Sequence, residues 1–504
     1  MTDCVRRTVG RPSRLPGMDG PIDPDALRHA ARDWRAAAWR RRRAVLRRFR
    51  QALVNATAEL HTGVPIPSRT LTQTTVAEVL PLAAACRWLE RHGRRTLRDR
   101  RLRLIRRPGW LPGVHGRVVR EPHGAVLILG TWNYPIFLTG VQLLQALAAG
   151  NAVAIKPGRD CRRVSERLAW MLRDAGLPEG LLRVLDDSAA TGEQAVAAGF
   201  DYIVLTGSAA TGRKVLHAAA QTLTPCTVEL SGSDAVLVGE DADVERAARC
   251  VAFGLSFNGG ATCIAPRRVF VPDALADEFL AKLHEHLSDV VVPPSLRQAA
   301  VPLVADALRR GATPGVPPRG TASDGETAPA AALPESRSPS KPTPPVVLDR
   351  CTPEMRLLHS DVFAPVLAVV RCVDHADMLT KASACPYALG ASVFGSDPAL
   401  LSVPAGCVTV NDLIVPTADP RVPFGGRGES GYGVTRGPEG LLAMTRPRVI
   451  LRRRGTALPH LDPPHETDAD LLGGAAQVRY GDWATKWLGL KRTFAAGRRR
   501  STGG

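Results

Sequence analysis

The sequence predicts an α/β protein with a doubly wound, largely parallel sheet and a second α/β domain. From Arg120 onward, short apolar runs alternate with helical periodicity, as in successive βαβ units. A turn of small residues, Thr206–Gly212, follows one of these runs and opens a predicted helix. At 504 residues the chain is also too long for one hydrophobic core, so two or three domains are expected.

The N-terminal part is predicted to be helical. Residues 24–60 and 76–104 carry apolar residues at helical spacing, and Pro65 and Pro67 interrupt the pattern between them. Residues 1–23 are expected to be a disordered leader. They contain no apolar core of the signal-peptide type.

The alternating region supplies the predicted sheet. Strands are expected at 125–129, 152–156, 181–185 and 202–206, and helices at 138–149, 164–175, 194–198 and 212–221. Such an order places ligands at the carboxyl ends of the strands.

The second half of the chain continues the α/β pattern with one interruption. An αβ series runs from Val228 to about Leu308. Residues 311–346 are rich in Pro, Ser, Thr, Ala and Gly, which predicts a surface loop or a disordered insert. The segment after Arg454 is weakly patterned and is expected to be a weakly ordered tail.

The net charge of +18 is concentrated near the N-terminus, since +16 of it falls within the first 107 residues. The Arg runs there are interrupted by apolar residues at helical spacing, so we favour solvated faces of amphipathic helices over an anionic partner. Neither zinc-finger spacing nor an aromatic RNA-binding pattern accompanies the charge, which makes nucleic acid an unlikely partner.

The ten cysteines form no CxxC pairs, so the sequence predicts neither a metal site nor a disulfide framework. No stretch approaches the length of a membrane span. The expectation is a reduced, cytoplasmic protein without a membrane span.

Four separated segments carry the chemistry. Gly130–Pro135 (GTWNYP) follows the first predicted strand, and Lys156 ends the next one. Within Thr206–Gly212, small residues let backbone N–H groups and a helix N-terminus approach a pyrophosphate. Leu223–Leu230 (LTPCTVEL) and Asn258–Cys263 (NGGATC) complete the set. Taken singly, each would also fit a tight turn, a surface carboxylate or an inert buried thiol.

In this order the segments resemble those of the aldehyde dehydrogenase superfamily, with GTWNYP closest to the class 3-like members. Glu229 and Cys263 are 34 positions apart, which is the family's spacing. Downstream, Asp361–Pro365 (DVFAP), Pro423–Gly426 (PFGG) and Ser430–Gly433 (SGYG) match further signatures. The resemblance covers roughly residues 20–450.

The resemblance implies an NAD(P)+-dependent oxidation of an aldehyde, hydrophobic and aliphatic or aromatic, through a thiohemiacetal and a thioester. Cys263 would be the nucleophile, Glu229 the general base and Asn133 an oxyanion donor. The cofactor, NAD or NADP, would contact Trp132, Lys156, Arg159, Gly207, Ser208, Gly212, Asp361 and Phe363.

The resemblance also implies a domain plan. A Rossmann-like cofactor domain with the N-terminal helices would span residues 24–225, with bridging strands near 109–124. A catalytic domain would span 226–410. Residues 411–453 would return to the cofactor domain and supply a small β oligomerisation element, followed by the tail 454–504. A homodimer is expected.

Five positions depart from the family pattern. Arg159 stands where many relatives carry a Glu that binds the adenosine ribose, so the sequence predicts that NADP+ is used at least as well as NAD+. Ser231, Ser233 and Ala261 replace a Gly, a Lys and a Gln, and Asp361 is one methylene shorter than the usual Glu. None of these changes removes a bond-making group.

Two other functions fit the sequence. One is an acylating or semialdehyde-specific relative. The other is a catalytically impaired paralogue whose Arg-rich N-terminal helices bind an anionic partner.

Overall fold

The computed structural model describes residues 22–502 apart from 67–68, 104–107, 109–110, 112, 291–293, 316–343, 457, 459 and 462. The chain divides into a larger unit, Met1–Arg100 with Val118–Arg448, and a smaller one, Arg101–Arg117 with Val449–Gly504. The predicted leader lies almost entirely outside the described residues. So does most of the predicted 311–346 insert.

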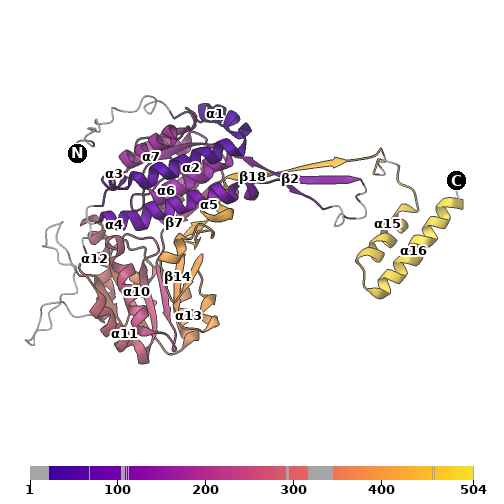
Figure 1. Ribbon diagram of the computed structural model, residues 1–504. Helices are drawn as coiled ribbons and strands as arrows, with labels where there is room; N and C mark the ends of the chain where they lie inside the picture. The colour runs from indigo at the N-terminus through magenta and orange to yellow at the C-terminus, as the bar shows by residue number, and fades with distance from the viewer. Residues whose placement is uncertain are drawn as a thin grey trace, which may run out of the picture. The chain divides into compact units, whose positions relative to one another are not determined.

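A six-stranded sheet forms the first half of the larger unit (Figure 1). Its order is β17 (Gly431–Tyr432), β7 (Cys226–Leu230), β6 (Tyr202–Gly207), β3 (Ala125–Leu129), β4 (Ala152–Lys156) and β5 (Leu182–Val184). The pairs between β7 and β5 are parallel, and β17 runs antiparallel to β7. Every residue of β3 is buried, as expected for a parallel strand covered on both faces.

Helices pack against this sheet. Those in contact with its strands are α1 (Pro24–Ala36), α6 (Phe137–Ala149), α7 (Arg162–Asp174), α8 (Ala189–Ala197) and α9 (Ala209–Ala220). The next layer and its connections comprise α2 (Trp39–Asn55), α3 (Thr57–His61), α4 (Leu71–Thr74), the π-helical turn η1 (Thr75–Val79), α5 (Leu80–Thr96) and α14 (Gly437–Ala443). The predicted alternation of strands and helices is therefore confirmed.

Two helices, α8 and α9, begin three or more residues earlier than the periodicity predicts, because serine side chains cap them. Ser188 accepts a hydrogen bond from the Thr191 backbone N–H, so α8 starts at Ala189 rather than at 194. Ser208 does the same for Thr211, and α9 starts at Ala209.

A seven-stranded sheet forms the second half of the larger unit. Its order is β10 (Thr313–Pro314), β11 (Val346–Asp349), β12 (Val366–Cys372), β9 (Pro266–Pro272), β8 (Asp234–Val238), β14 (Gly390–Phe394) and β15 (Cys407–Val410), with β10 antiparallel to β11 and the rest parallel. Successive residues of β8 belong to two different apolar clusters, so both faces of this sheet are buried.

The remaining elements of this half are short or helical. They are α10 (Val244–Ser256), η3 (Phe257–Gly260), α11 (Asp273–His286), α12 (Pro294–Arg309), η4 (Arg356–His359), α13 (His375–Ser383), β13 (Tyr387–Ala388), η5 (Pro398–Ser402), η6 (Val415–Ala418) and β16 (Arg427–Gly428).

The border predicted at residue 226 lies a few residues later in the structure. β7 pairs with β6 in parallel, Ile203 opposite Cys226, so residues 226–230 belong to the first sheet. The second sheet begins with β8 at Asp234.

β1 (Arg100–Arg101), β2 (Val114–Pro122) and β18 (Thr445–Arg453) form a three-stranded sheet. Of the region 109–124, where bridging strands are expected, the described residues form one strand, β2. The segment predicted to be a weakly ordered tail instead contains two helices, α15 (Asp468–Tyr480) and α16 (Trp483–Thr502). They pack through small residues, which apolar periodicity does not reveal. Among the described residues, no helix is both long and apolar enough to cross a membrane.

Several arginines of the basic N-terminal region form ion pairs or hydrogen bonds with other parts of the larger unit. Arg28 forms an ion pair with Asp201 at 3.1 Å, and Arg50 pairs with Glu90 at 2.6 Å. Arg42 donates to the carbonyl of Ala148. These three arginines therefore take part in contacts within the fold, and the prediction of solvated helix faces does not describe them.

Candidate active site

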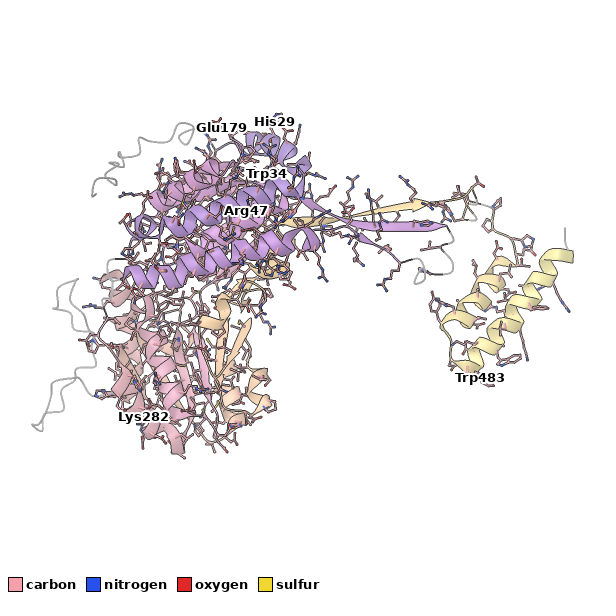
Figure 2. The ribbon with its side chains drawn as sticks, viewed as in Figure 1. His29, Trp34, Arg47, Glu179, Lys282 and Trp483 are labelled. Atoms are coloured by element: carbon pink, nitrogen blue, oxygen red, sulfur yellow. The ribbon has the colours of Figure 1, made fainter. Side chains whose placement is uncertain are left out.

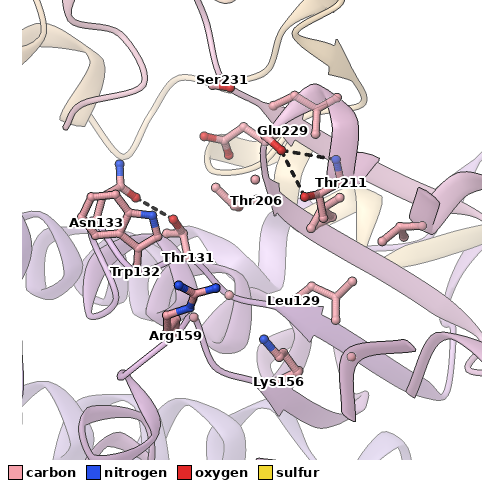
Figure 3. Close-up of a pocket in the computed structure, with 18 of the residues that line it drawn as sticks. Leu129, Thr131, Trp132, Asn133, Lys156, Arg159, Thr206, Thr211, Glu229 and Ser231 are labelled. Atoms are coloured by element: carbon pink, nitrogen blue, oxygen red, sulfur yellow. Dashed lines mark hydrogen bonds between the residues drawn. The ribbon is translucent and has the colours of Figure 1, made fainter. Parts of the chain in front are cut away.

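A cavity of about 660 Å³ opens at the carboxyl ends of the parallel strands of the first sheet (Figure 3). Lys156 ends β4, Gly207 ends β6, and Glu229 lies one residue before the end of β7. Because parallel strands present their carboxyl ends at one edge, residues far apart in sequence meet there. The cavity lining includes ten of the eleven predicted site residues: Trp132, Asn133, Lys156, Arg159, Gly207, Ser208, Glu229, Cys263, Asp361 and Phe363.

Gly212, the eleventh, does not line the cavity. A Cβ at this position would lie 2.8 Å from Leu230 Cδ1, so the glycine lets α9 approach β7 closely. Its contribution is helix–strand packing, which places the N-terminus of α9 beside the cavity.

One part of the cavity wall carries positive charge. Lys156 and Arg159 lie together across the cavity from Glu229 (Figure 3). Burial lowers the pKa of the Lys156 ammonium, while Asp187 and Asp186 raise it. Lys214, from the first turns of α9, also lines the cavity. Helix N-termini and cations of this kind favour phosphate groups.

Cys263 lies on the loop that follows η3. Asn258 and Gly259 adopt left-handed backbone conformations there, with φ of 56° and 63°, and this turns the chain toward the cavity. Burial raises the pKa of the Cys263 thiol, the nearby carboxyl groups of Glu229 and Asp234 raise it further, and Arg436 opposes them.

Glu229 is 2% exposed, and its two carboxyl oxygens differ in their partners. Oε2 accepts a hydrogen bond from Thr435 Oγ1 at 3.0 Å, whereas Oε1 is buried with no hydrogen-bond partner among the described residues. Burial raises the pKa of the carboxyl group, and Arg436 and Thr435 lower it. One oxygen is thus held in place, and the other remains available to accept a proton.

The orientation of the Asn133 side chain follows from its contacts. Thr131 Oγ1 donates to Asn133 Oδ1 at 2.6 Å (Figure 3). The Asn133 amide nitrogen donates to the carbonyl of Ala261 at 2.9 Å. The Nδ2 group therefore faces the loop that carries Cys263.

Sequence reasoning missed a buried ion pair beside this loop. Arg69 pairs with Glu78, and it also donates to Asn258 Oδ1 at 3.1 Å and to the Asn133 carbonyl at 2.5 Å. Glu78 Oε2 accepts from the backbone N–H of Ile136 at 2.6 Å. A usable signal existed, because Arg69 and Glu78 are the sole Asp, Glu, Lys or Arg residues between positions 60 and 86.

A second buried arginine, Arg267, was also missed. Its guanidinium donates to the carbonyls of Gly260, Thr262 and Ala364. It thereby connects the Cys263 loop to the segment that carries Asp361. Burial lowers the pKa of Arg267 to about 10.

Two of the departures from the family pattern contact each other. Ser231 Oγ donates a hydrogen bond to Asp361 Oδ2, and Asp361 Oδ1 is buried with no partner among the described residues. Phe363, two residues later, lies 6.3 Å from Trp132 between ring centroids. Because Ser231 occupies Oδ2, Asp361 Oδ1 is the oxygen available to a ligand in the cavity.

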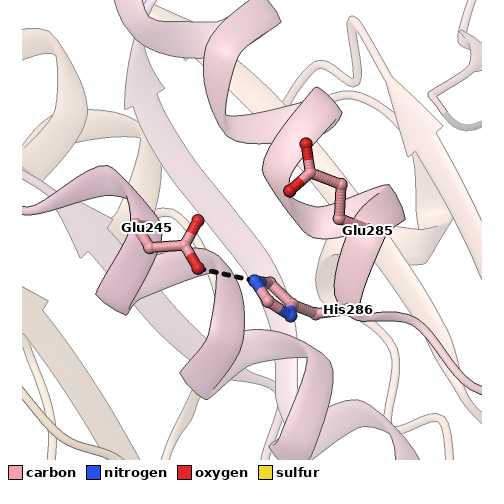
Figure 4. A group of neighbouring side chains, drawn as sticks. All are labelled: Glu245, Glu285 and His286. Carbon is pink, nitrogen blue, oxygen red and sulfur yellow. Dashed lines mark hydrogen bonds and ion pairs between the residues drawn. The ribbon is translucent and has the colours of Figure 1, made fainter.

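Glu245, Glu285 and His286 form a separate cluster on α10 and α11 (Figure 4). Their ligand atoms lie within 4.8 Å of one another. Lys282 Nζ lies 3.8 Å from Glu245 and 3.5 Å from Glu285, and His286 pairs with Glu245 at 2.7 Å. Lys282 already offsets the two carboxylates, and His286 is engaged with Glu245, so the cluster offers little to a metal ion.

A doubly wound sheet with a cavity at its strand ends is typical of nucleotide-dependent enzymes. Residues 24–450 match the model described as the aldehyde dehydrogenase family. The chain therefore belongs to the aldehyde dehydrogenase family, whose members are oxidoreductases that act on an aldehyde group.

Individual relatives agree with this assignment. The chain is 30% identical to a 4,4'-diapolycopene aldehyde oxidase of Methylomonas sp over 84% of each chain. It is 30% identical to the dimeric NADP-preferring aldehyde dehydrogenase of Mus musculus, covering 66% of this chain and 73% of the mouse protein. Among solved structures, the NADP-dependent glyceraldehyde-3-phosphate dehydrogenase of Bacillus halodurans C-125, complexed with NADP, has a TM-score of 0.75 at 26% identity. That match covers 85% of this chain and 90% of the other.

Proposed function

We propose that the protein oxidises a hydrophobic aldehyde, aliphatic or aromatic, to its carboxylic acid with NAD(P)+ through a thioester on Cys263. The observation that carries this proposal is that Cys263, Glu229 and Asn133 line one cavity together with Lys156 and Arg159. A thiol, a buried base and an amide donor are the groups that this chemistry needs.

The residues present fit a dinucleotide. Ser208 caps α9 beside the cavity, and Lys156 and Arg159 supply positive charge. Asp361 Oδ1, which has no hydrogen-bond partner among the described residues, can accept a hydrogen bond from a ribose hydroxyl. When bound, NAD(P)+ supplies the acceptor for the hydride that leaves the substrate carbon.

Cys263 begins the reaction by attacking the aldehyde carbon as a thiolate. The attack forms a C–S bond and leaves an alkoxide on the former carbonyl oxygen. The Asn133 Nδ2 group, aimed at the Cys263 loop, is the donor placed to stabilise that charge. Because two negative charges repel one another in this buried site, the thiolate forms most readily while Glu229 is protonated.

Glu229 serves in the second half of the reaction, after loss of hydride has left a thioester. Its ionised carboxylate accepts a proton from water, and the resulting hydroxide adds to the thioester carbon. Collapse of that adduct breaks the C–S bond, releases the carboxylic acid and regenerates the Cys263 thiolate. The raised pKa of Glu229 makes it a stronger base than an ordinary carboxylate.

The substrate class rests on the relatives and on the cavity wall. The Methylomonas relative is named for a 4,4'-diapolycopene aldehyde, and Trp132, Phe363 and Leu296 give the cavity an apolar lining. The mouse relative is described as dimeric, which supports a homodimer, and its NADP preference agrees with Arg159. Arg159 has no ion-pair partner among the described residues.

The test is a panel of aldehydes assayed with NAD+ and with NADP+, following the absorbance of the reduced nicotinamide. Long-chain and aromatic aldehydes should give the highest kcat/KM, and Cys263→Ala should abolish turnover while still binding the cofactor. A semialdehyde as best substrate, or a requirement for coenzyme A, would replace the proposed reaction. Normal turnover by Cys263→Ala would exclude the thioester.

A further inference from the structure

The C-terminal helical hairpin formed by α15 and α16 has an unusual distribution of residue sizes. Its interface is made of small residues. A Cβ on Gly474 would lie 2.7 Å from the Gly489 carbonyl oxygen, and one on Gly489 would lie 2.6 Å from Gln477 Cβ. Ala496 is fully buried. The two helices therefore approach closely without enclosing any large apolar side chain of α16.

The large apolar side chains of α16 point outward instead. Trp483, Trp487, Leu490 and Phe494 are spaced i, i+4, i+7 and i+11, which places them along one face of the helix. Their exposed fractions are 77%, 54%, 52% and 70%. Trp483 lies at the start of the helix (Figure 2). We call this face the aromatic stripe.

The charge on α16 has a single sign. Residues 483–502 contain six Lys and Arg residues and no Asp or Glu. Asp470 of α15 pairs with Arg492 at 2.9 Å and with Arg499 at 2.6 Å, so one carboxylate faces two of the six cations. Lys486 and Lys491 flank the aromatic stripe in the helical order.

We propose that the hairpin binds an anionic lipid surface, with the aromatic stripe inserted at the level of the headgroups. Tryptophan and phenylalanine on one face with Lys and Arg beside them is the composition of helices that lie in a membrane interface. Tryptophan also favours the boundary between headgroups and acyl chains. The cations attract anionic headgroups.

A second copy of the chain fits this face less well. Pairing two stripes would bring two α16 helices, each with six cations and no acids, against one another. An anionic membrane surface instead supplies countercharge over the whole length of the helix. The helix need not span the bilayer, because a stripe of this kind inserts while lying parallel to the surface.

The experiment uses the full chain in a flotation assay with two kinds of vesicle. One contains phosphatidylcholine alone, and the other an equimolar mixture of phosphatidylcholine and phosphatidylglycerol. The wild-type protein should float with the mixed vesicles, and added salt should reduce the bound fraction. The triple variant Trp483→Ser, Trp487→Ser and Phe494→Ser should lose roughly tenfold in partitioning, since it lacks most of the inserted apolar area.

Two further variants sharpen the test. Trp170→Ser removes a tryptophan that is 40% exposed on α7, outside the hairpin, and should bind as the wild type does. Lys486→Glu with Lys491→Glu should lose the preference for anionic vesicles. Far-ultraviolet circular dichroism and thermal melting show whether each variant is folded.

Several results would overturn the proposal. They are failure of the wild type to float with the mixed vesicles, equal binding to both vesicle types, and full binding by the folded triple variant. Sedimentation velocity without lipid provides the remaining outcome. If the wild type assembles through the stripe and the triple variant dissociates, the occupant is a second copy of the chain.

Discussion

Thr435→Val tests how the structure sets the basicity of Glu229. The substitution removes the hydroxyl that donates to Glu229 Oε2 at 3.0 Å and keeps a side chain of nearly the same shape. That hydroxyl has one proton and a second acceptor, the Phe424 carbonyl at 3.3 Å, so it can turn away when Glu229 is protonated. The hydrogen bond therefore stabilises the ionised carboxylate selectively.

The expected magnitude follows from the strength of such a bond. Hydrogen bonds to charged groups contribute about 1.5–3 kcal/mol. At about 1.4 kcal/mol for each pKa unit, the loss should raise the pKa of Glu229 by about one to two units. Arg436 remains in the variant and still lowers the pKa of the carboxyl group. The other carboxyl oxygen, Glu229 Oε1, has no hydrogen-bond partner among the described residues.

The assay is kcat as a function of pH with an aldehyde whose thioester hydrolysis limits turnover. A general base works in its ionised form, so the rising limb of the profile should move to higher pH in the variant. The plateau should remain close to that of the wild type. Thr409→Val is the matched control, since it removes a buried hydroxyl that pairs with Ser392 at 2.9 Å in the second sheet. A rising limb that stays in place in Thr435→Val, or moves to lower pH, would show that the Thr435 hydroxyl does not lower the pKa of Glu229.

Two other predictions use the same cavity. Glu229→Gln should keep a pre-steady-state burst of reduced cofactor and lose steady-state turnover, because the amide cannot take a proton from water; loss of the burst with turnover intact would reverse the assignment. Arg159→Glu should lower the ratio of kcat/KM for NADP+ over NAD+ by roughly fivefold, the effect of about 1 kcal/mol for an exposed charge pair. An unchanged ratio would mean that Arg159 does not contact the cofactor.

The predicted strands of the first sheet were close to correct, because local patterns define them. β3 and β4 are apolar runs bounded by turn residues, and their observed limits equal those expected from the sequence. The starts of α8 and α9 depended on serine caps, which periodicity does not register. Local signals thus located the strands better than the helix ends.

The candidate site could be predicted where a motif supplies it. Cys263 and Glu229, which the resemblance of their motifs to the family singles out, both lie on the cavity wall. The sequence does not predict the role of the Arg69–Glu78 pair, because Arg69 also bonds to Asn133 and Asn258, which are 64 and 189 positions away in the sequence. Only the folded chain brings those partners together.

The helical spacing of the aromatic stripe was a usable signal for α16, but it indicates the wrong face as the one that packs. Apolar residues at helical spacing normally indicate the face that packs on a core. Here the packing face is formed by Gly474, Gly489 and Ala496, which contribute almost nothing to such a pattern. Small residues that permit close approach leave no periodic apolar signal of their own.

Ser231 and Asp361 look like two unrelated departures in the sequence, but their contact makes them one feature. Asp361 is one methylene shorter than the family's Glu, and Ser231 adds a hydroxyl where the family has Gly. That hydroxyl donates to Asp361 Oδ2 and leaves Oδ1 available to the cavity. The serine therefore fixes the shorter carboxylate in a defined orientation.

A double-mutant cycle tests this coupling. Ser231→Gly alone removes the donor from a buried carboxylate, so the pKa of Asp361 should rise further above its ordinary value. Asp361→Glu alone pushes a longer side chain toward the Ser231 hydroxyl. Each single variant should weaken NAD(P)+ binding, measured as the dissociation constant by quenching of tryptophan fluorescence. The double variant, which restores both family residues, should bind better than the sum of the single effects predicts, with a coupling of about 1–2 kcal/mol. Additive effects, within about 0.5 kcal/mol, would mean that the two replacements act independently.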